Sequence, residues 1–359
     1  MSKQDVKERE SFDAQEIETP KATMPPFDIV AYNEMRSCHD LWTMYDRKIL
    51  VIDPDFQRHN VWSNKDRSLF IDSLLKGLPI PSICLFHDQA TGKRYVVDGL
   101  QRISSVIALL GDHDKWTISN IEGVDERIRG LSVDDLKKEK RDVLYQIDES
   151  VLPLTIIRGD FSKKEHQDYL VQIFSRLNSG GKRLLNQEVR NCIFRGALND
   201  HLKAFVRCCE WLDFTGMTIK KIDDDRFGQE ERVLRIFAFN RCEEMYEKSL
   251  NGFLNDVMSR YKTIDDAEFE KFADRLKKAM KVFRMIPAEC VRKNWNISEA
   301  VLIGIMHNQL SAEVAEPQTL QDRYNTFVVK VEAGGIREGL MQPKKVHNRL
   351  DLARELFCL

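Results

Sequence analysis

The spacing of apolar residues predicts two regions along the chain, one that mixes strands with helices and one that is helical. In the first 160 or so residues, apolar runs of strand length alternate with segments of helical period. From Lys163 onward, apolar residues recur almost everywhere with the period of a helix face. We therefore expect an α+β fold, an α/β domain followed by a mainly α-helical C-terminal lobe. The expected strands are 48–52, 83–87, 94–97 and 151–157, and the clearest early helix is 64–76.

The expected helix at 64–76 carries start and stop signals. Ser63 precedes it, and a serine hydroxyl can accept a hydrogen bond from the free N–H groups of a first turn. Gly77 follows it and tolerates the left-handed backbone that commonly ends a helix. The next two strands are joined by a short turn that contains Gly92, so we expect them to pair as a hairpin whose second strand leads directly into Asp98.

Composition indicates an ordinary soluble globular protein. Of the 359 residues, 42% are hydrophobic and 31% charged, and no apolar run approaches the roughly 20 residues that span a bilayer. The chain starts without a hydrophobic leader, so the cytoplasm is the expected location. Eight cysteines without a Cys-x-x-Cys spacing are expected to be reduced thiols. The net charge of −2 argues against a protein that coats nucleic acid, but it is compatible with a local basic groove.

Three regions are expected along the chain. Residues 1–26 are highly charged and end in two prolines, which predicts a flexible arm. Residues 27–160 are assigned to the α/β domain, and the polar stretch 112–150 within it is expected to be a peripheral helix or insertion. Residues 161–359 are assigned to the helical domain.

The candidate chemistry lies where the second hairpin strand turns into a helix. The sequence Asp98-Gly99-Leu100-Gln101-Arg102 places Gln101 and Arg102 in the first helical turn, where free N–H groups and the helix dipole attract a phosphate. Gly99 lets the backbone approach the anion closely, and the Arg102 guanidinium adds charge-assisted hydrogen bonds. Asp98 could hold a divalent cation or orient a water beside that phosphate. The alternative interpretation is an ordinary Asp-Gly turn followed by a solvated arginine.

Two other segments could complete such a site. Upstream, an extended stretch ends in Arg58, which could be a second phosphate clamp. Downstream, the Gly-Gly loop within 176–181 is followed by two cations and could cradle an anion, with Arg176 and Asn178 closing the pocket. The alternative for this loop is a plain helix stop, with Asn186 capping the next helix.

These segments resemble the N-terminal domain of GmrSD-type restriction enzymes, a ParB-like family with an Asp-Gly-Gln-Gln-Arg signature after a strand. The signature here departs from the family's pattern at Leu100, which replaces the first Gln and puts a role for that amide in doubt. The stretches that also look like the family, over roughly residues 27–250, are Phe56-Gln57-Arg58 with Trp62, Gly77-Leu78-Pro79-Ile80-Pro81 and Phe174–Gly181.

The resemblance implies a ParB/sulfiredoxin-like fold for residues 27–160 and a nucleotide-binding protein, with hydrolysis tied to the signature, that acts in defence against foreign or modified DNA. The implied cofactor is Mg²⁺ with a nucleoside triphosphate. The implied residues are Asp98, Gln101 and Arg102 for catalysis, Gln57, Arg58, Gly99, Arg102, Arg176 and Asn178 for nucleotide binding, and Asp98 for the metal.

Two other functions stay open. One is a non-catalytic subunit that binds DNA or a partner protein, and the other is a Mg²⁺-dependent nuclease, which ranks last because a single Asp makes a poor two-metal site. The expected partners are a nucleotide, DNA, a separate effector nuclease and a second copy of the chain, with no membrane. Larger relatives of the family carry a His-Asn-His nuclease domain, whereas His307-Asn308 and His347-Asn348 lie here in helical patterns, so we expect no such domain.

Overall fold

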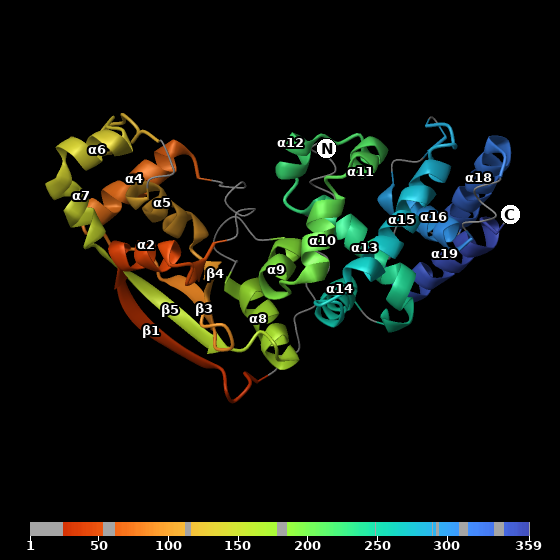
Figure 1. Cartoon of the computed structure of the whole chain (residues 1–359), viewed down its shortest axis with the longest axis horizontal. Helices are drawn as coiled ribbons and strands as arrows, with labels where there is room; N and C mark the ends of the chain where they lie inside the picture. The colour runs from red at the N-terminus through yellow and green to blue at the C-terminus, as the bar shows by residue number, and fades with distance from the viewer. Residues whose placement is uncertain are drawn as a thin grey trace. The chain divides into compact units, whose positions relative to one another are not determined.

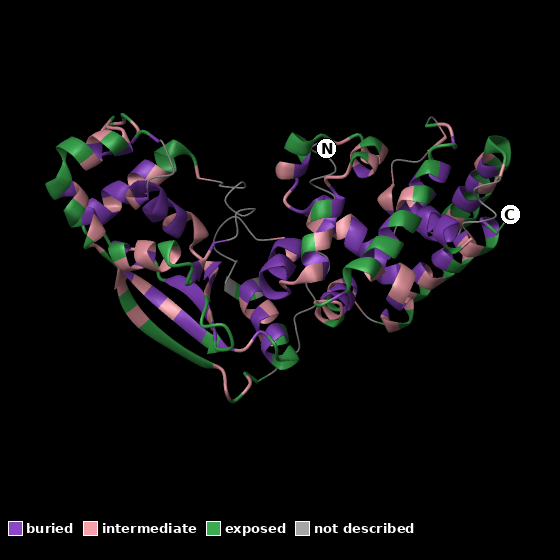
Figure 2. Cartoon of the chain, viewed as in Figure 1, coloured by how far each residue is buried: buried purple, intermediate pink, exposed green. Residues whose placement is uncertain are grey.

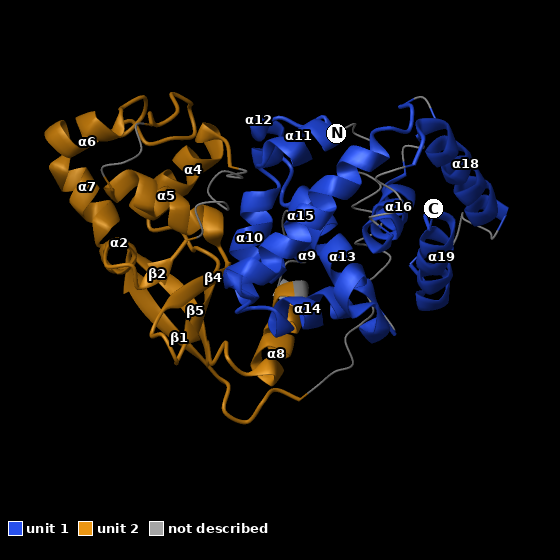
Figure 3. Cartoon of the chain, turned by 45° about the vertical axis from the view of Figure 1, so that its right-hand side comes forward, with its two compact units in different colours: residues 1–19, 185–359 blue, residues 20–184 orange. Residues whose placement is uncertain are grey.

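The structure, a computed structural model, describes residues 24–52, 62–111, 116–177, 185–247, 249–288, 290–291, 294–308, 315–333 and 341–358. These residues form two compact units, whose described parts are 24–177 and 185–358 and which are treated separately below (Figure 3). No helix within the described ranges combines the length and apolarity needed to cross a lipid bilayer. The arm expected at residues 1–26 lies almost wholly outside the described residues.

The first unit is built on a mixed five-stranded sheet with the strand order β1-β5-β3-β4-β2. The expected hairpin is confirmed, since β3 and β4 pair antiparallel, and β5 runs parallel to β3 and antiparallel to β1. The strands are β1 (Val30–Ser37), β2 (Leu50–Val51), β3 (Ile83–Asp88), β4 (Arg94–Asp98) and β5 (Val151–Gly159).

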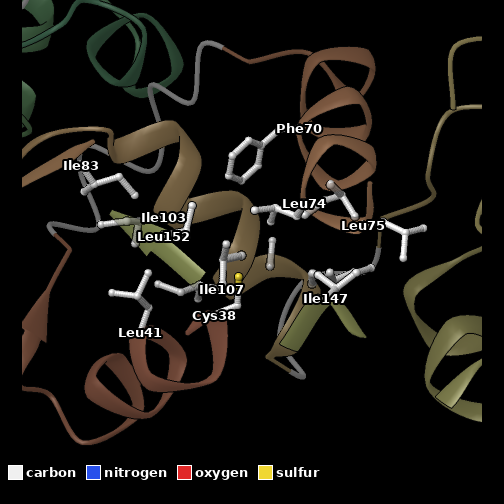
Figure 4. Close-up of a cluster of buried hydrophobic side chains, with 14 of the residues drawn as sticks. Cys38, Leu41, Phe70, Leu74, Leu75, Ile83, Ile103, Ile107, Ile147 and Leu152 are labelled. Carbon is white, nitrogen blue, oxygen red and sulfur yellow. The ribbon is translucent and has the colours of Figure 1, made fainter. Parts of the chain in front are cut away.

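Helices cover one face of this sheet (Figure 1). Ile83 and Leu152 from the sheet pack there against Ile103 and Ile107 of α5 and Phe70 of α4 in one buried cluster (Figure 4). Burial of such side chains, at about 1.5–3 kcal/mol each, is the main force that holds helices and sheet together. The helices of the unit are α2 (Cys38–Asp46), α4 (Asn64–Leu75), α5 (Leu100–Leu110), α6 (Val133–Glu139), α7 (Arg141–Asp148) and α8 (Lys164–Leu177).

Helix α4 has the ends that its sequence predicts. The Ser63 hydroxyl accepts a hydrogen bond from the Asp66 N–H at 3.2 Å, and the Asp66 carboxylate accepts one from the Ser63 N–H at 3.0 Å, which together form a capping box. Gly77 follows the helix with a φ of +63°, in the left-handed region. Local side-chain chemistry is therefore sufficient to define this helix.

The two outer strands differ from the expectation. Strand β1 had not been predicted, because this edge strand is largely exposed and its apolar residues do not alternate clearly with polar ones (Figure 2). Strand β2 covers only Leu50–Val51 of the predicted 48–52, because Lys48 has a φ of +58° and belongs to a turn. The predicted hairpin strands and the strand at 151–157 are confirmed as β3, β4 and β5.

Helix α8 belongs to the first unit, and hydrogen bonds attach it to Asp28, near the N-terminal end of that unit. Buried His166 accepts a hydrogen bond from the Asp160 N–H at its Nδ1, at 2.9 Å, and its Nε2 lies 2.9 Å from an Asp28 oxygen. Lys163 also donates to Asp28. Hydrogen bonds from Lys163 and His166 lower the pKa of Asp28 to about 2. The helical region therefore begins where the sequence predicts, but its first helix, α8, belongs to the unit that contains the sheet.

The second unit is helical, which confirms the fold class expected from the sequence. Helix α13 lies at its centre, packs against α9, α10, α14 and α16, and has its apolar residues fully buried. All eight cysteines of the chain are described and form no disulfide. The helices are α9 (Asn186–Ile193), α10 (Ala197–Phe205), α11 (Cys209–Thr215), α12 (Ile219–Asp223), α13 (Gly228–Cys242), α14 (Leu250–Arg260), α15 (Asp266–Phe283), α16 (Trp295–His307), α18 (Pro317–Ala333) and α19 (Pro343–Leu356).

A buried arginine joins three helices of the second unit. Arg190 of α9 is 1% exposed, so its charge needs partners inside the protein. Its guanidinium donates to Asn251 at 2.7 Å and Asn255 at 3.1 Å on α14, and to Glu231 on α13 at 3.2 Å. These bonds fix α9 against α13 and α14.

We expect the Asp28→Asn variant to lose stability near neutral pH and to resemble the wild type in acid. The folded-state pKa of Asp28, about 2, lies below its ordinary 3.8. The ion pairs of Asp28 therefore stabilise the fold above pH 3.8, and this contribution is lost as the pH falls toward 2. The free energy of unfolding in urea, measured across this range, should show the variant and the wild type converging in acid. The exposed Asp46→Asn is the control, and an equal loss at every pH would contradict the prediction.

Candidate functional site

The candidate site forms at the turn from β4 into α5. Strand β4 ends at Asp98, Gly99 occupies the N-cap position, and α5 begins at Leu100, which is the predicted order of strand, turn and helix. Gln101 and Arg102 therefore lie in the first turn of α5, as the sequence predicts. The first α5 hydrogen bond, from the Ile103 N–H to the Gly99 carbonyl, is 3.1 Å long.

Only glycine fits at position 99 without strain. Its φ is +89°, a backbone conformation that other residues rarely adopt. A Cβ atom at this position would also lie 2.9 Å from Cγ1 of Ile83, a side chain fully buried in β3. Gly99 thus allows the close approach of the turn to the sheet, and it has no side chain to cover the N–H groups at the start of α5.

We expect Gly99→Ala to lower the free energy of unfolding by about 2–4 kcal/mol, because left-handed strain adds to overpacking against Ile83. Gly77→Ala is the matched control, since Gly77 has a similar φ of +63° with no atom near the position of a Cβ. The control should cost only about 1–2 kcal/mol. Urea unfolding of both variants measures the difference, and equal losses would show that the contact with Ile83 has no effect.

Arg102 is held by the chain itself. Its Nη2 donates to Oδ2 of Asp98 at 2.9 Å, and its Nη1 donates to the Pro81 carbonyl and, at 3.4 Å, to the Ser82 carbonyl. The side chain is 13% exposed, whereas that of Asp98 is 40% exposed. The alternative interpretation, a solvated Arg102, is therefore wrong, because carbonyls of the approach to β3 surround the guanidinium. In this arrangement Arg102 positions the Asp98 carboxylate, which stays accessible.

The other two residues of the motif contact different neighbours. Oε1 of Gln101 accepts a long hydrogen bond, 3.4 Å, from the Trp62 N–H, and this joins α5 to the segment that enters α4. Leu100, which departs from the family signature, is half-buried and packs against the hydrophobic core of the unit. An apolar residue suits that position, because the side chain contributes to packing.

The geometry fits an anion better than a protein-held metal ion. The N–H groups at the start of α5 and the helix dipole favour a negatively charged ligand. Among the described residues, no three His, Cys, Asp or Glu side chains are grouped as metal ligands, and Asp98 is the one carboxylate of the motif. Mg²⁺ in proteins is commonly held by one or two carboxylates together with substrate phosphates. Asp98 therefore fits Mg²⁺ only as a single ligand to an ion that arrives with its phosphates.

Several predicted site residues cannot be compared with the structure. Gln57, Arg58 and Asn178 lie outside the described residues, so their roles stay predictions. Arg176 is exposed in the last turn of α8, and its role also stays a prediction.

In the alternative interpretation of the Gly-Gly loop, Asn186 caps the next helix, and this part of it was wrong. Asn186 is the first residue of α9, and Leu185 occupies the cap position. The N-terminus of α9 is capped by Glu188, whose carboxylate accepts a hydrogen bond from the Leu185 N–H at 2.7 Å.

Polar residues beside the motif had not been singled out from the sequence. Cys84 of β3 pairs with Asp98 across the hairpin, and burial, with a smaller effect of the Asp98 charge, raises the pKa of its thiol to about 12. The Ser82 and Thr155 hydroxyls lie 2.9 Å apart, and Thr155 donates to the Asn33 amide oxygen at 3.0 Å. The prolines before β3 were the only sequence signal, since they predict an extended approach but not the carbonyls that hold Arg102.

The fold and the site define a protein with an α+β domain that offers a helix N-terminus beside an arginine-held carboxylate, followed by a helical lobe. Residues 39–195 match the family model described as the GmrSD restriction endonuclease, N-terminal domain. The match runs from α2 through α9, so the resemblance seen in the sequence is confirmed, and it suggests a restriction-type defence system. No curated protein and no solved structure gives a significant match to the chain.

Proposed function

We propose that the chain binds and hydrolyses a nucleoside triphosphate at the β4–α5 turn, within a restriction-type system that acts against foreign or modified DNA. The observation that supports this most strongly is the turn itself, where Gly99 gives the N-terminus of α5 no side-chain cap, beside the accessible carboxylate of Asp98. Backbone N–H groups at such a position suit the phosphates of a nucleotide. The family match supports the defence role.

Each motif residue has a proposed role that follows from its contacts. Asp98 orients the attacking water or binds the Mg²⁺ that accompanies the triphosphate, which would neutralise phosphate charge. Gln101 orients the phosphate or the water, since it lies in the first turn of α5. Arg102 holds Asp98 in place and adds positive charge beside the phosphates. Gln57, Arg58, Arg176 and Asn178 are proposed as further nucleotide contacts.

We expect Asp98→Asn and Arg102→Ala each to reduce the rate of nucleoside triphosphate hydrolysis by about 100-fold or more, the usual loss when a charged stabilising group is removed. The assay measures phosphate release from the four common ribonucleoside triphosphates, with Mg²⁺ and with or without DNA. Arg127→Ala is the matched control, because Arg127 pairs with Asp125 at 3.0 Å in the same unit but away from the motif. Absence of hydrolysis in the wild type, or unchanged rates in both site variants, would disprove the assignment.

A second candidate function, DNA binding without turnover, is favoured by a row of residues on the sheet that contains the cations Arg158 and Arg94. Val30 pairs with Arg158, Arg158 with His87 and His87 with Arg94, so one row crosses β1, β5, β3 and β4. Because side chains alternate along a strand, Arg158 lies on the same face as the core residue Ile156. This row therefore lies on the face that the helices partly cover.

The positive charge of this row comes from Arg158 and Arg94, of which Arg94 is paired with Glu34. Glu34 is shared between Arg94, at 2.6 Å, and Arg36, at 3.2 Å. Arg158 is exposed and forms no ion pair within the described ranges. Burial, with additional effects of Arg94 and Arg158, lowers the pKa of His87, as expected in a positive environment. The phosphate backbone of DNA is the complementary partner.

If this row contacts DNA, the affinity for a duplex should fall steeply with salt, and Arg158→Ala should reduce the slope of the log–log plot by about 1. Fluorescence anisotropy with a labelled duplex in a series of salt concentrations measures both quantities. The exposed Lys138→Ala on α6 is the control and should leave the slope unchanged. A slope that is the same in wild type and Arg158→Ala would exclude this surface.

A further inference from the structure

A second candidate site lies at the other end of α5. A cavity of about 300 Å³ opens there between α2, the end of α5 and α7. Helix α5 contributes Leu110, its last residue, whereas Asp98 and Gly99 precede its first residue. The ten steps from Leu100 to Leu110, at 1.5 Å each, separate the two ends of the helix by about 15 Å. The cavity is therefore separate from the site proposed for the triphosphate.

One face of α7 forms a wall of this cavity. Arg141, Leu144, Tyr145 and Asp148 all line it, and their spacing of three, four and seven residues places them on one side of a helix. The wall thus carries a cation at one end, an apolar and aromatic middle, and a carboxylate at the other end. At 1.5 Å per residue, the backbone positions of the two charged residues are about 10 Å apart.

The stability of α7 does not explain these two charges. A cation at a helix N-terminus and an anion at its C-terminus are placed against the helix dipole. Asp142 supplies the favourable first-turn carboxylate, and its position next to Arg141 in the helix puts it on a different face. In the described part of the chain, the Arg141 guanidinium forms no ion pair and donates only a long bond, 3.4 Å, to the Lys137 carbonyl. Arg141 is therefore available for an anionic ligand.

Helix α2 supplies the opposite side of the cavity. Nδ1 of His39 lies 3.1 Å from Oδ2 and 3.3 Å from Oδ1 of Asp148, which fixes the carboxylate between the two helices. The rings of His39 and Trp42 are 5.9 Å apart. Tyr145 on the α7 side is 65% exposed, so its ring is accessible to a ligand.

We propose that this cavity binds a planar heteroaromatic ring that carries an anionic group, the chemical class of a nucleoside monophosphate. Trp42 and Tyr145 offer aromatic surfaces to the ring, with Leu110 and Leu144 contributing apolar contact. Asp148 accepts a hydrogen bond from a ring N–H or exocyclic amine, and Arg141 pairs with the phosphate. Because the two charges of the wall lie far apart, a free amino acid, whose charges are on neighbouring atoms, fits less well.

The proposal does not depend on hydrolysis at Asp98, and the experiment separates the two sites. Saturation-transfer NMR and calorimetry on the full chain would measure binding of AMP, CMP, GMP and UMP. We expect saturable binding of at least one of them in the wild type and in Arg102→Ala. Tyr145→Ala and Arg141→Ala, both of exposed residues whose loss should not unfold the protein, are each expected to weaken it at least 10-fold.

Tyr32→Ala on β1, another exposed tyrosine of the same unit, is the control and should bind like the wild type. Three results would overturn the proposal: no saturable binding of any of the four nucleotides, binding unchanged in Tyr145→Ala and Arg141→Ala, or binding abolished by Arg102→Ala. The last result would place the nucleotide at the Asp98 motif. Failure of triphosphate hydrolysis would leave this experiment unaffected, so the two proposals stand or fall separately.

Discussion

The close contact between Gly99 and Ile83 is the constraint on which the candidate site depends. The turn passes so near the buried strand β3 that a Cβ atom would lie 2.9 Å from Ile83. That proximity sets where α5 begins, and with it the direction of the free N–H groups at its N-terminus. It also brings Arg102 to the carbonyls of Pro81 and Ser82, just before β3. The position of the Asp98 carboxylate follows from these contacts.

Arginines fix neighbouring segments in both units, and this changes how the motif should be interpreted. A guanidinium has five donors in a rigid plane, so it can bond several acceptors at once. Arg102 joins Asp98 to the approach of β3, and Arg190 joins α9 to α13 and α14. An arginine that follows Asp-Gly in a sequence suggests a phosphate ligand. In the folded protein Arg102 donates a hydrogen bond to the Asp98 carboxylate.

Much of the first unit could be predicted because its signals are local. Ser63 and Asp66 cap α4 through backbone groups within the same turn, and Gly77 ends it by its own φ of +63°. The order of strand, glycine and helix at the motif has the same local origin. Strand β1 escaped prediction because an exposed edge imposes no regular alternation on its residues. The predicted length of β2 was wrong because nothing in the sequence signals that Lys48 has a left-handed backbone conformation.

The sequence by itself determined the class of fold, the family resemblance and the turn that carries the motif, since these depend on residues close together in the chain. The tertiary structure alone decided what the side chains do. Arg102 donates a hydrogen bond to the carbonyl of Pro81, which lies 21 residues earlier in the chain. Arg94 pairs with Glu34, which lies 60 residues earlier. At the cavity between α2 and α7, the His39 ring likewise contacts the carboxylate of Asp148, which lies 109 residues later in the chain. Such contacts arise only when the apolar faces of distant elements pack together, and neither periodicity nor local motifs specify which side chains meet.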